Sequence, residues 1–291
     1  MISVHILEEL MAQGILLGGL YALISYGLSI ALGIIREINV AHGSLLILAA
    51  YLGFAGYETL RLSPLLSLVW IVPLFFAIGW AIQKGILNKA ISVGLNDVVI
   101  ITFALSIIIE NLLLAIFSYD TRSLAMPNGS LRLSLGPITI QFQLLMDFVA
   151  GIAMLILLNF IFKRTLTGKA MRALPADPLA AQLLGINPGY IYALAMGLAM
   201  SIAAVSGIFL GSTFVFMPSS GDTYILLAFG IVVLGGLGSL IGTLVGGLIL
   251  GEVFVFTGYL LGASMQMTST LIFLLIVLLA LPTGLFRGEI F

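Results

Sequence analysis

Long apolar stretches recur along the whole chain and limit its fold more than any other feature. They lie near residues 10–34, 41–60, 64–87, 96–118, 142–162, 189–216, 223–262 and 266–286. An α-helix needs roughly 20 residues to cross about 30 Å of hydrocarbon. Lipid offers the backbone no hydrogen-bond partner, so such segments cross as helices. With 61% hydrophobic and 8% charged residues, we expect an all-α, polytopic membrane protein in which residues 1–291 form a single transmembrane domain.

The apolar segment 223–262 is too long for one ordinary crossing. Its centre, GGLGSLIGTLVGG, is rich in glycine, which favours two short, broken or re-entrant helices and gives eight or nine crossings in total. Gly238, Gly242 and Gly246 repeat every four residues and predict a helix-packing surface, because small residues let helix backbones approach in lipid. The alternative is that broken helices here line a substrate route.

The basic residues predict the orientation, since Lys and Arg concentrate in short cytoplasmic loops. With the N-terminus outside and the C-terminus inside, 8 of the 11 basic residues fall inside and only Arg61, Arg122 and Arg132 fall outside. This arrangement requires an odd number of crossings. It favours a hairpin of two helices in 223–262 and places Arg287 inside.

The outer loop 118–141 differs in texture from the apolar segments. Leucines at 131, 133 and 135 alternate with polar residues, Gly136-Pro137 predicts a turn, and isoleucines at 138 and 140 alternate with Thr139. This pattern predicts a small β-hairpin on the outer face. Such a hairpin is either a structured cap or a contact surface for an external partner.

The segment 163–188 is the longest polar interruption and carries Lys163, Arg164, Lys169 and Arg172. The first two basic residues end the preceding span at the membrane surface. A helix from Gly168 is expected to end at Leu174, before Pro175. Asp177-Pro178 then predicts the start of a second short helix that ends at Gly185, and Asn187-Pro188 repeats the start signal.

These two short helices are too short to be stable alone, so they need a surface to pack on. They present Met171, Leu174, Leu179 and Leu183 together with Arg172. The segment is either a solvated connector along the membrane surface or a lever through which a soluble engine moves the membrane helices. The lever hypothesis predicts that Arg172→Glu or Leu174→Glu uncouples that engine while insertion stays intact.

Ionisable residues inside spans are costly and are therefore candidate sites. They and their polar companions are the candidates for a substrate pathway, and the alternative for each is a structural hydrogen bond. Asp147, near the start of its span, is expected to reach the surface, and Glu252 could tie broken helix ends together. The candidate pathway residues are Asn39, His42, Glu110, Asn111 and Glu252.

Several kinds of chemistry have no support in the sequence. Cysteine is absent and there are only two histidines, so we expect no metal site. No Ser/His/Asp constellation and no P-loop is present, since Thr167-Gly168-Lys169 lacks the preceding glycine and the following Ser or Thr. We therefore expect no catalytic residues, no cofactor bound by this chain and no nucleic-acid partner.

Four stretches resemble a known family: GLYALISYGLSIALGIIREINVAHGSLLILAAYL, TGKAMRALPADPLAAQLLGIN, FGIVVLGGLGSLIGTLVGGLILG and LPTGLF. They are similar to the permease subunits of branched-chain amino acid ABC importers, the H-type subunit in particular; the family also includes urea and amide permeases. The stretches span nearly the full chain in the family's order. Arg36-Glu37 departs from the apolar or small residues of many members.

The resemblance implies a multi-pass permease of a bacterial or archaeal inner membrane that carries a branched-chain amino acid or a similar small amino acid or amide. It implies two ATPase subunits that bind ATP and Mg, a second related permease subunit in a hetero- or homodimer, and an external substrate-binding protein. It also implies that the polar segment couples to the ATPases. The coupling residues are then Lys169, Met171, Arg172, Leu174, Asp177, Leu179 and Leu183.

An alternative from another class is a self-sufficient secondary transporter or channel in which Glu110 is a proton-linked gate. It predicts uptake by the purified chain alone, driven by a proton gradient and lost in Glu110→Gln. An intramembrane enzyme is disfavoured because no nucleophile is paired with a base.

Overall fold

Nine helices in the described part of the chain are long and apolar enough to cross a membrane. The computed structural model describes residues 4–91, 94–126, 129–135, 138–281 and 284–286. Arg287 and the Gly136-Pro137 turn lie outside these residues. The helices are α1 (Val4–Ile30), α2 (His42–Leu60), α3 (Pro64–Ile82), α4 (Asn88–Ile91), α5 (Leu95–Phe117), α6 (Phe142–Arg164), α7 (Leu166–Ala176), α8 (Pro178–Leu183), α9 (Pro188–Thr213), α10 (Ser220–Gly235), α11 (Leu240–Leu261) and α12 (Gln266–Ala280).

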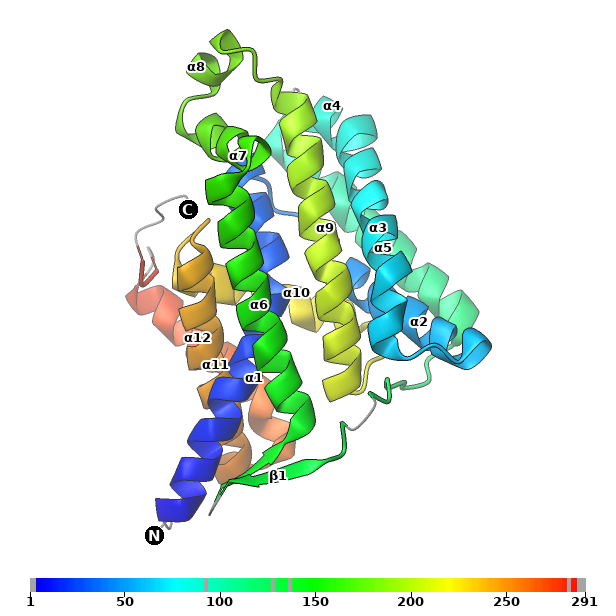
Figure 1. The fold of residues 1–291 in the computed structure, drawn as a ribbon, viewed down its shortest axis with the longest axis vertical. Coiled ribbons are helices and arrows are strands. Elements are labelled where there is room, and N and C mark those ends of the chain that lie inside the picture. Colours follow the sequence, from blue (N-terminus) through cyan, green and yellow to red (C-terminus); the bar gives the residue numbers. More distant parts are fainter. Residues whose placement is uncertain (1–3, 92–93, 127–128, 136–137, 282–283, 287–291) are drawn as a thin grey trace.

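Two spans continue as π-helical turns, Ala31–Ile35 after α1 and Gln83–Leu87 between α3 and α4, and a 3₁₀ turn, Ala263–Met265, precedes α12. The expected hairpin in the 118–141 loop is present as antiparallel strands β1 (Arg132–Leu135) and β2 (Ile138–Gln141), with Leu133 opposite Ile140. Figure 1 shows the hairpin and the N-terminus at one end of the molecule and α4, α7 and α8 at the other. We call these the hairpin end and the coupling end.

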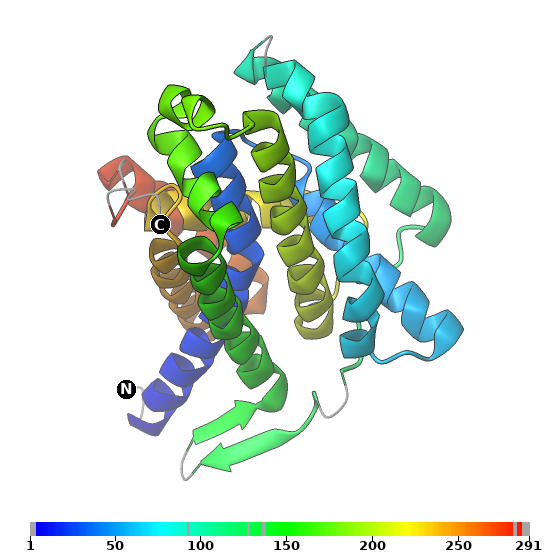
Figure 2. The same cartoon turned by 45° about the horizontal axis from the view of Figure 1, so that its top comes forward.

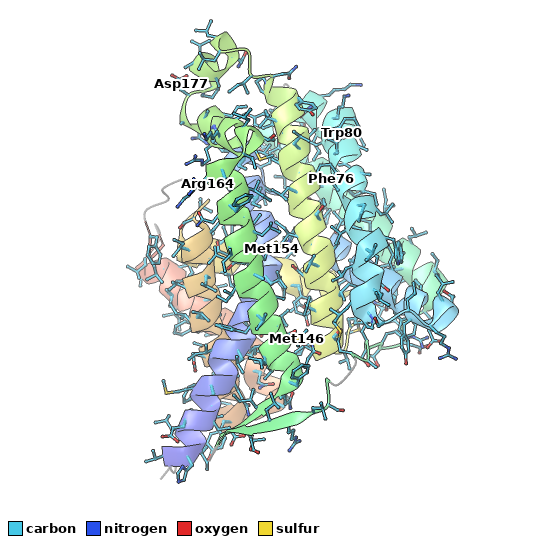
Figure 3. The ribbon with its side chains drawn as sticks, viewed as in Figure 1. Phe76, Trp80, Met146, Met154, Arg164 and Asp177 are labelled. Carbon is cyan, nitrogen blue, oxygen red and sulfur yellow. The ribbon has the colours of Figure 1, made fainter. Side chains whose placement is uncertain are left out.

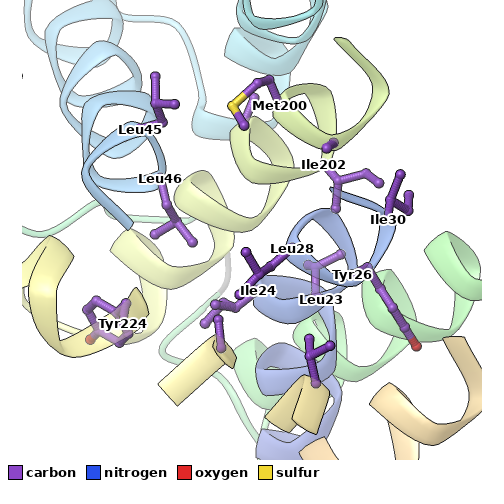
Figure 4. Close-up of a cluster of buried hydrophobic side chains, with 14 of the residues drawn as sticks. Leu23, Ile24, Tyr26, Leu28, Ile30, Leu45, Leu46, Met200, Ile202 and Tyr224 are labelled. Atoms are coloured by element: carbon purple, nitrogen blue, oxygen red, sulfur yellow. The ribbon is translucent and has the colours of Figure 1, made fainter. Parts of the chain in front are cut away.

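Helix α1 lies at the centre of the bundle and packs on α11, α6, α9 and α10. The turned view in Figure 2 shows α11 and α12 on one flank and α3 and α5 on the opposite flank. Figure 4 shows buried side chains from α1, α2, α9 and α10 meeting in one cluster, among them Ile24, Leu46, Ile202 and Tyr224. The outer helices carry apolar side chains that stay exposed, as lipid or a partner subunit requires.

The glycine-rich segment divides into two helices, as predicted. Helix α10 ends at Gly235, the turn 236–239 follows, and the Ser239 side chain accepts a hydrogen bond from Gly242 N at 3.1 Å to begin α11. Gly238 lies in this turn at φ +81°, where glycine has no steric penalty, and so is not part of a helix surface. Gly242 and Gly246 lie on α11 against the backbone of α10 at Gly235 and Ile231.

Candidate functional site

The polar segment forms two short helices at the coupling end, and the start signals predicted at Asp177-Pro178 and Asn187-Pro188 are present. The cap of the first helix was not predicted. The side chain of Thr165 caps α7 by accepting from Gly168 N at 3.0 Å. Asp177 caps α8 by accepting from Leu179 N and Ala180 N at 3.1 and 2.9 Å. Asn187 caps α9 in the same way. Figure 3 shows Asp177 at the junction of α7 and α8, beyond Arg164 at the end of α6.

The predicted bounds of the first helix, Gly168 and Leu174, were each wrong by two residues, since α7 begins at Leu166. Helix α7 runs to Ala176 and includes Pro175, because a proline in the last turn removes one N–H donor without entering the middle of a helix. Helix α8 ends in a Schellman motif: Gly185 has φ +83°, Gly185 N donates to Gln182 O, and Ile186 N donates to Ala181 O. That conformation favours glycine at this position.

The predicted apolar face divides between the interior and the solvent. On α7, Met171 is 3% exposed and Leu174 is 0% exposed, so both belong to the chain's own core. On α8, Leu179 and Leu183 are 70% and 81% exposed, and Leu184 just after it is 82% exposed. The exposed leucines of the predicted face are therefore on α8, whereas Met171 and Leu174 attach α7 to the membrane helices.

Arg172 is half-buried on α7, and its Nε atom has no hydrogen-bond partner in the described residues. Lys169 is exposed. Sequence reasoning missed Leu184 and also Leu166, which is 85% exposed at the start of α7. Their signal was present, since both are leucines in the longest polar interruption of the chain.

Arg36 connects the coupling segment to the central helix. It follows the π-helical turn of α1 at φ +61°, and its Nη2 donates to the carbonyl of Pro175 at 2.8 Å. A non-glycine residue in the left-handed region is uncommon; here Arg36 is the C-cap of the π-helical turn, and its backbone N–H donates to Ala31 O at 3.1 Å. The contact with Pro175 joins the end of α1 to the last turn of α7.

Glu37 lies beside this contact and is 2% exposed, and within the described part of the chain its carboxylate oxygens make no hydrogen bond of standard geometry. Burial raises the pKa of Glu37 to about 7, while the Gln83 side chain acts in the opposite direction. The raised pKa means that the folded chain favours the protonated form.

The Glu37→Gln variant is expected to be more thermostable than the parent at pH 8 and equally stable at pH 4. A carboxyl whose pKa is raised by folding reduces stability as pH rises from its unfolded value through about 7. Removing the charge should raise Tm by about 2 to 4 °C at pH 8. Thermal unfolding in detergent measures this, and the same gain at pH 4 would show that the charge is not the cause.

Asn39 and His42 lie together at the start of α2 and make structural contacts. Asn39 Oδ1 accepts from Ala41 N at 3.0 Å, and Asn39 Nδ2 contacts Met196 Sδ at 3.6 Å on α9. His42 is 1% exposed, and its Nε2 lies 3.0 Å from the carbonyl oxygen of Ile24 on α1. These bonds join α1, α2 and α9.

The other residues of the candidate pathway lie elsewhere. Glu110 and Asn111 are on α5, where Asn111 Nδ2 donates to Ile107 O of its own helix at 2.8 Å. Glu252 lies on α11 against Gly14 of α1, so it does not reach the break at 236–239, and its Oε2 is buried without a hydrogen-bond partner. The structure therefore does not bring the five candidate residues into one site.

Asp147 does not reach the surface, contrary to expectation. It is 0% exposed on α6 and accepts hydrogen bonds from Gln143 Nε2 at 2.9 Å and Thr213 Oγ1 at 2.6 Å. This buried network lies at the hairpin end. Within the described ranges, no group of three or more His, Cys, Asp or Glu side chains could hold a metal ion.

A family model and individual relatives indicate the same protein family for this chain. Residues 10–280 match the family described as branched-chain amino acid transport system, permease component. The permease protein LivH of a high-affinity branched-chain amino acid transport system from Salmonella typhimurium is 31% identical, covering 94% of each chain. The corresponding BraD of Pseudomonas aeruginosa is 29% identical, covering 97% of this chain and 95% of its own.

A solved chain of PsaBC from Streptococcus pneumoniae, in complex with a Fab, has a TM-score of 0.49 and 16% identity, covering 94% of this chain and 90% of its own; this likeness is too distant to add to the assignment. The sequence match, in contrast, extends over nearly the whole membrane domain. This chain belongs to the family of permease components of branched-chain amino acid transport systems.

Proposed function

We propose that this chain is one permease subunit of an ATP-driven importer and forms half of the pathway for a branched-chain amino acid or a similar small amino acid or amide. Two observations on this family member carry the proposal. Its described residues contain nine helices able to cross a membrane, and α8 holds exposed leucines beyond them. The relatives named above belong to branched-chain amino acid systems, which supports this substrate class.

Coupling to the ATPases would pass through the two short helices in sequence. The exposed leucines of α8 would dock on an ATPase subunit. Burying apolar surface in such a contact contributes a favourable free energy of about 25 cal/mol per Å². Motion of α8 would pass to α7, whose Met171 and Leu174 are buried in the membrane domain. The Arg36 contact to Pro175 would carry it on to α1.

A permease subunit of this kind would work with several other proteins. Two ATPase subunits would bind and hydrolyse ATP with Mg, since this chain carries no P-loop. A second related permease subunit, in a homo- or heterodimer, would complete the pathway, and an external substrate-binding protein would deliver the cargo. The helices α3, α5, α6 and α12 all carry exposed apolar side chains that can face lipid or the second subunit.

Basic residues support an inner-membrane location with the coupling end in the cytoplasm. Lys163, Arg164 and Lys169 lie at this end, and Lys84 and Lys89 lie in the π-helical turn and α4, also at this end. The positive-inside rule places such an end in the cytoplasm. The N-terminus and the hairpin would then be outside.

Reconstitution of the complete importer in vesicles tests this function. ATPase activity should rise when the binding protein carries its amino acid, and uptake should require both ATP and the binding protein. Vesicles with this chain alone are the control, and they should show no uptake under a proton gradient. Uptake by the chain alone that is lost in Glu110→Gln would favour the secondary-transporter alternative and contradict the proposal.

A further inference from the structure

A pocket of 330 Å³ opens at the hairpin end, where α6 begins and α9 ends. Small-molecule sites commonly occupy about 300 to 1,000 Å³, so the pocket is large enough for one small ligand. One wall is formed by Leu124, Ala125 and Met126 of the loop before the hairpin. The lining also contains polar residues, which we call the polar wall, among them Gln141, Gln143 and Thr213.

The buried network behind the polar wall fixes which atoms that wall presents. Gln143 is 6% exposed and directs its Nε2 to one oxygen of Asp147, and the Thr213 hydroxyl donates to the other oxygen. A hydroxyl has one hydrogen, and an amide has its donors and its acceptor on different atoms. Asp147 therefore takes one of the two hydrogens of the Gln143 amide and, at the shorter distance, the Thr213 hydroxyl hydrogen, which also lies 3.1 Å from Phe209 O. Lone pairs on the Gln143 and Thr213 side-chain oxygens remain as acceptors.

The position of Gly129 shows where the Gln143 acceptor points. A Cβ atom added to Gly129, which lines the pocket, would lie 3.1 Å from Gln143 Oε1. That oxygen therefore reaches the loop that forms the pocket wall. Neutral donors hold both oxygens of Asp147, and the described residues show no basic side chain in contact with it.

We propose that this pocket binds the ammonium group of an amino acid with an apolar side chain, before the amino acid enters the membrane domain. The acceptor oxygens of Gln143 and Thr213 receive the ammonium hydrogens, and the apolar wall contacts the side chain. Asp147 is a positioning residue that keeps those oxygens turned toward the pocket. The inference rests on the proposed function, because it takes the hairpin end as the side from which cargo enters.

Cysteine protection in the assembled importer tests the pocket directly, because this chain has no natural cysteine. Ala125→Cys places a thiol at the exposed edge of the apolar wall, and Ser134→Cys, exposed on β1 away from the pocket lining, is the matched control. A membrane-impermeant maleimide labels each variant without ATP or binding protein. The parent importer gives the background from cysteines of partner subunits.

Three probes separate the two halves of the ligand. L-Leucine carries both charged groups, 3-methylbutan-1-amine keeps only the ammonium group, and 2-hydroxy-4-methylpentanoate lacks it. Leucine and the amine should slow labelling of Ala125→Cys severalfold, whereas the hydroxy acid should not, and labelling of Ser134→Cys should be unchanged by all three. Absence of protection by the amine, equal protection by the hydroxy acid, or equal protection at Ser134→Cys would overturn the inference.

Asp147→Asn in the Ala125→Cys background should raise the concentration of leucine needed for protection by about tenfold, since a hydrogen bond to a charged group is lost or weakened. Thr213→Val, which removes one acceptor, provides the second variant in case Asp147→Asn does not fold. Unchanged protection in folded variants would contradict the role of the network. The assay uses neither ATP nor the binding protein, so normal ATP-driven uptake with no protection refutes the pocket alone.

Discussion

Leu183→Glu on α8 is expected to reduce ATPase stimulation by the loaded binding protein at least about tenfold, while the chain still folds and inserts. The Leu183 side chain is 81% exposed, so the chain itself loses little packing. Burial of a leucine on docking is worth about 1.5 to 3 kcal/mol, and each 1.4 kcal/mol is a factor of ten. A carboxylate at this position also has to be desolvated at the interface.

Co-purification of the ATPase subunits and stimulated ATP hydrolysis measure the effect of Leu183→Glu. The matched variant is Leu174→Glu on α7, which changes the same residue type at 0% exposure. It should lower folded yield, because a buried charge without a partner is strongly destabilising. Leu174→Glu therefore cannot serve as the clean uncoupling variant that the sequence suggested. Normal co-purification and stimulation in Leu183→Glu would exclude α8 as the docking surface.

Gly18→Ala is expected to produce the second large effect, a loss of about 1 to 3 kcal/mol of stability. Helices α1 and α11 meet along glycines, and a Cβ atom at Gly18 would lie 2.5 Å from Leu248 Cα. Because that neighbour is backbone, the helices have to separate. Their contact lies at the centre of the bundle, so the separation disturbs many other contacts.

Gly85→Ala is the matched control, since an added Cβ atom there has nothing within 4 Å. The intrinsic preference for alanine over glycine in a helix, about 1 kcal/mol, should leave this variant as stable as the parent or more so. Thermal unfolding in detergent, followed by the fluorescence of Trp70 and Trp80, compares the two. Equal melting temperatures for both variants would rule out close packing at Gly18.

The sequence was sufficient to predict the spans and the short helices because both depend on local chemistry. The length of an apolar stretch predicts a membrane crossing. The residue before each proline, Asp177 or Asn187, caps the helix that follows it. The same local signals predicted the hairpin and the division of the glycine-rich segment. These features need no knowledge of which helices become neighbours.

The candidate pathway could not be predicted in the same way, because burial depends on neighbours that are distant in sequence. Glu252 lies against α1, which is more than 200 residues away in the chain. Leu174 and Leu183 have the same residue type and lie in adjacent helices, yet one is buried and the other exposed. The acceptor wall around Gln143 likewise depends on Thr213, which belongs to another helix.

The central position of α1 has a consequence for biogenesis. Helix α1 is synthesised before α11, yet it packs against Gly247 and Gly251 of that helix, more than 200 residues later in the chain. Until α11 is inserted, the small-residue side of α1 has only lipid to contact, which an apolar helix tolerates. The bundle can therefore close around α1 only after α11 has left the ribosome.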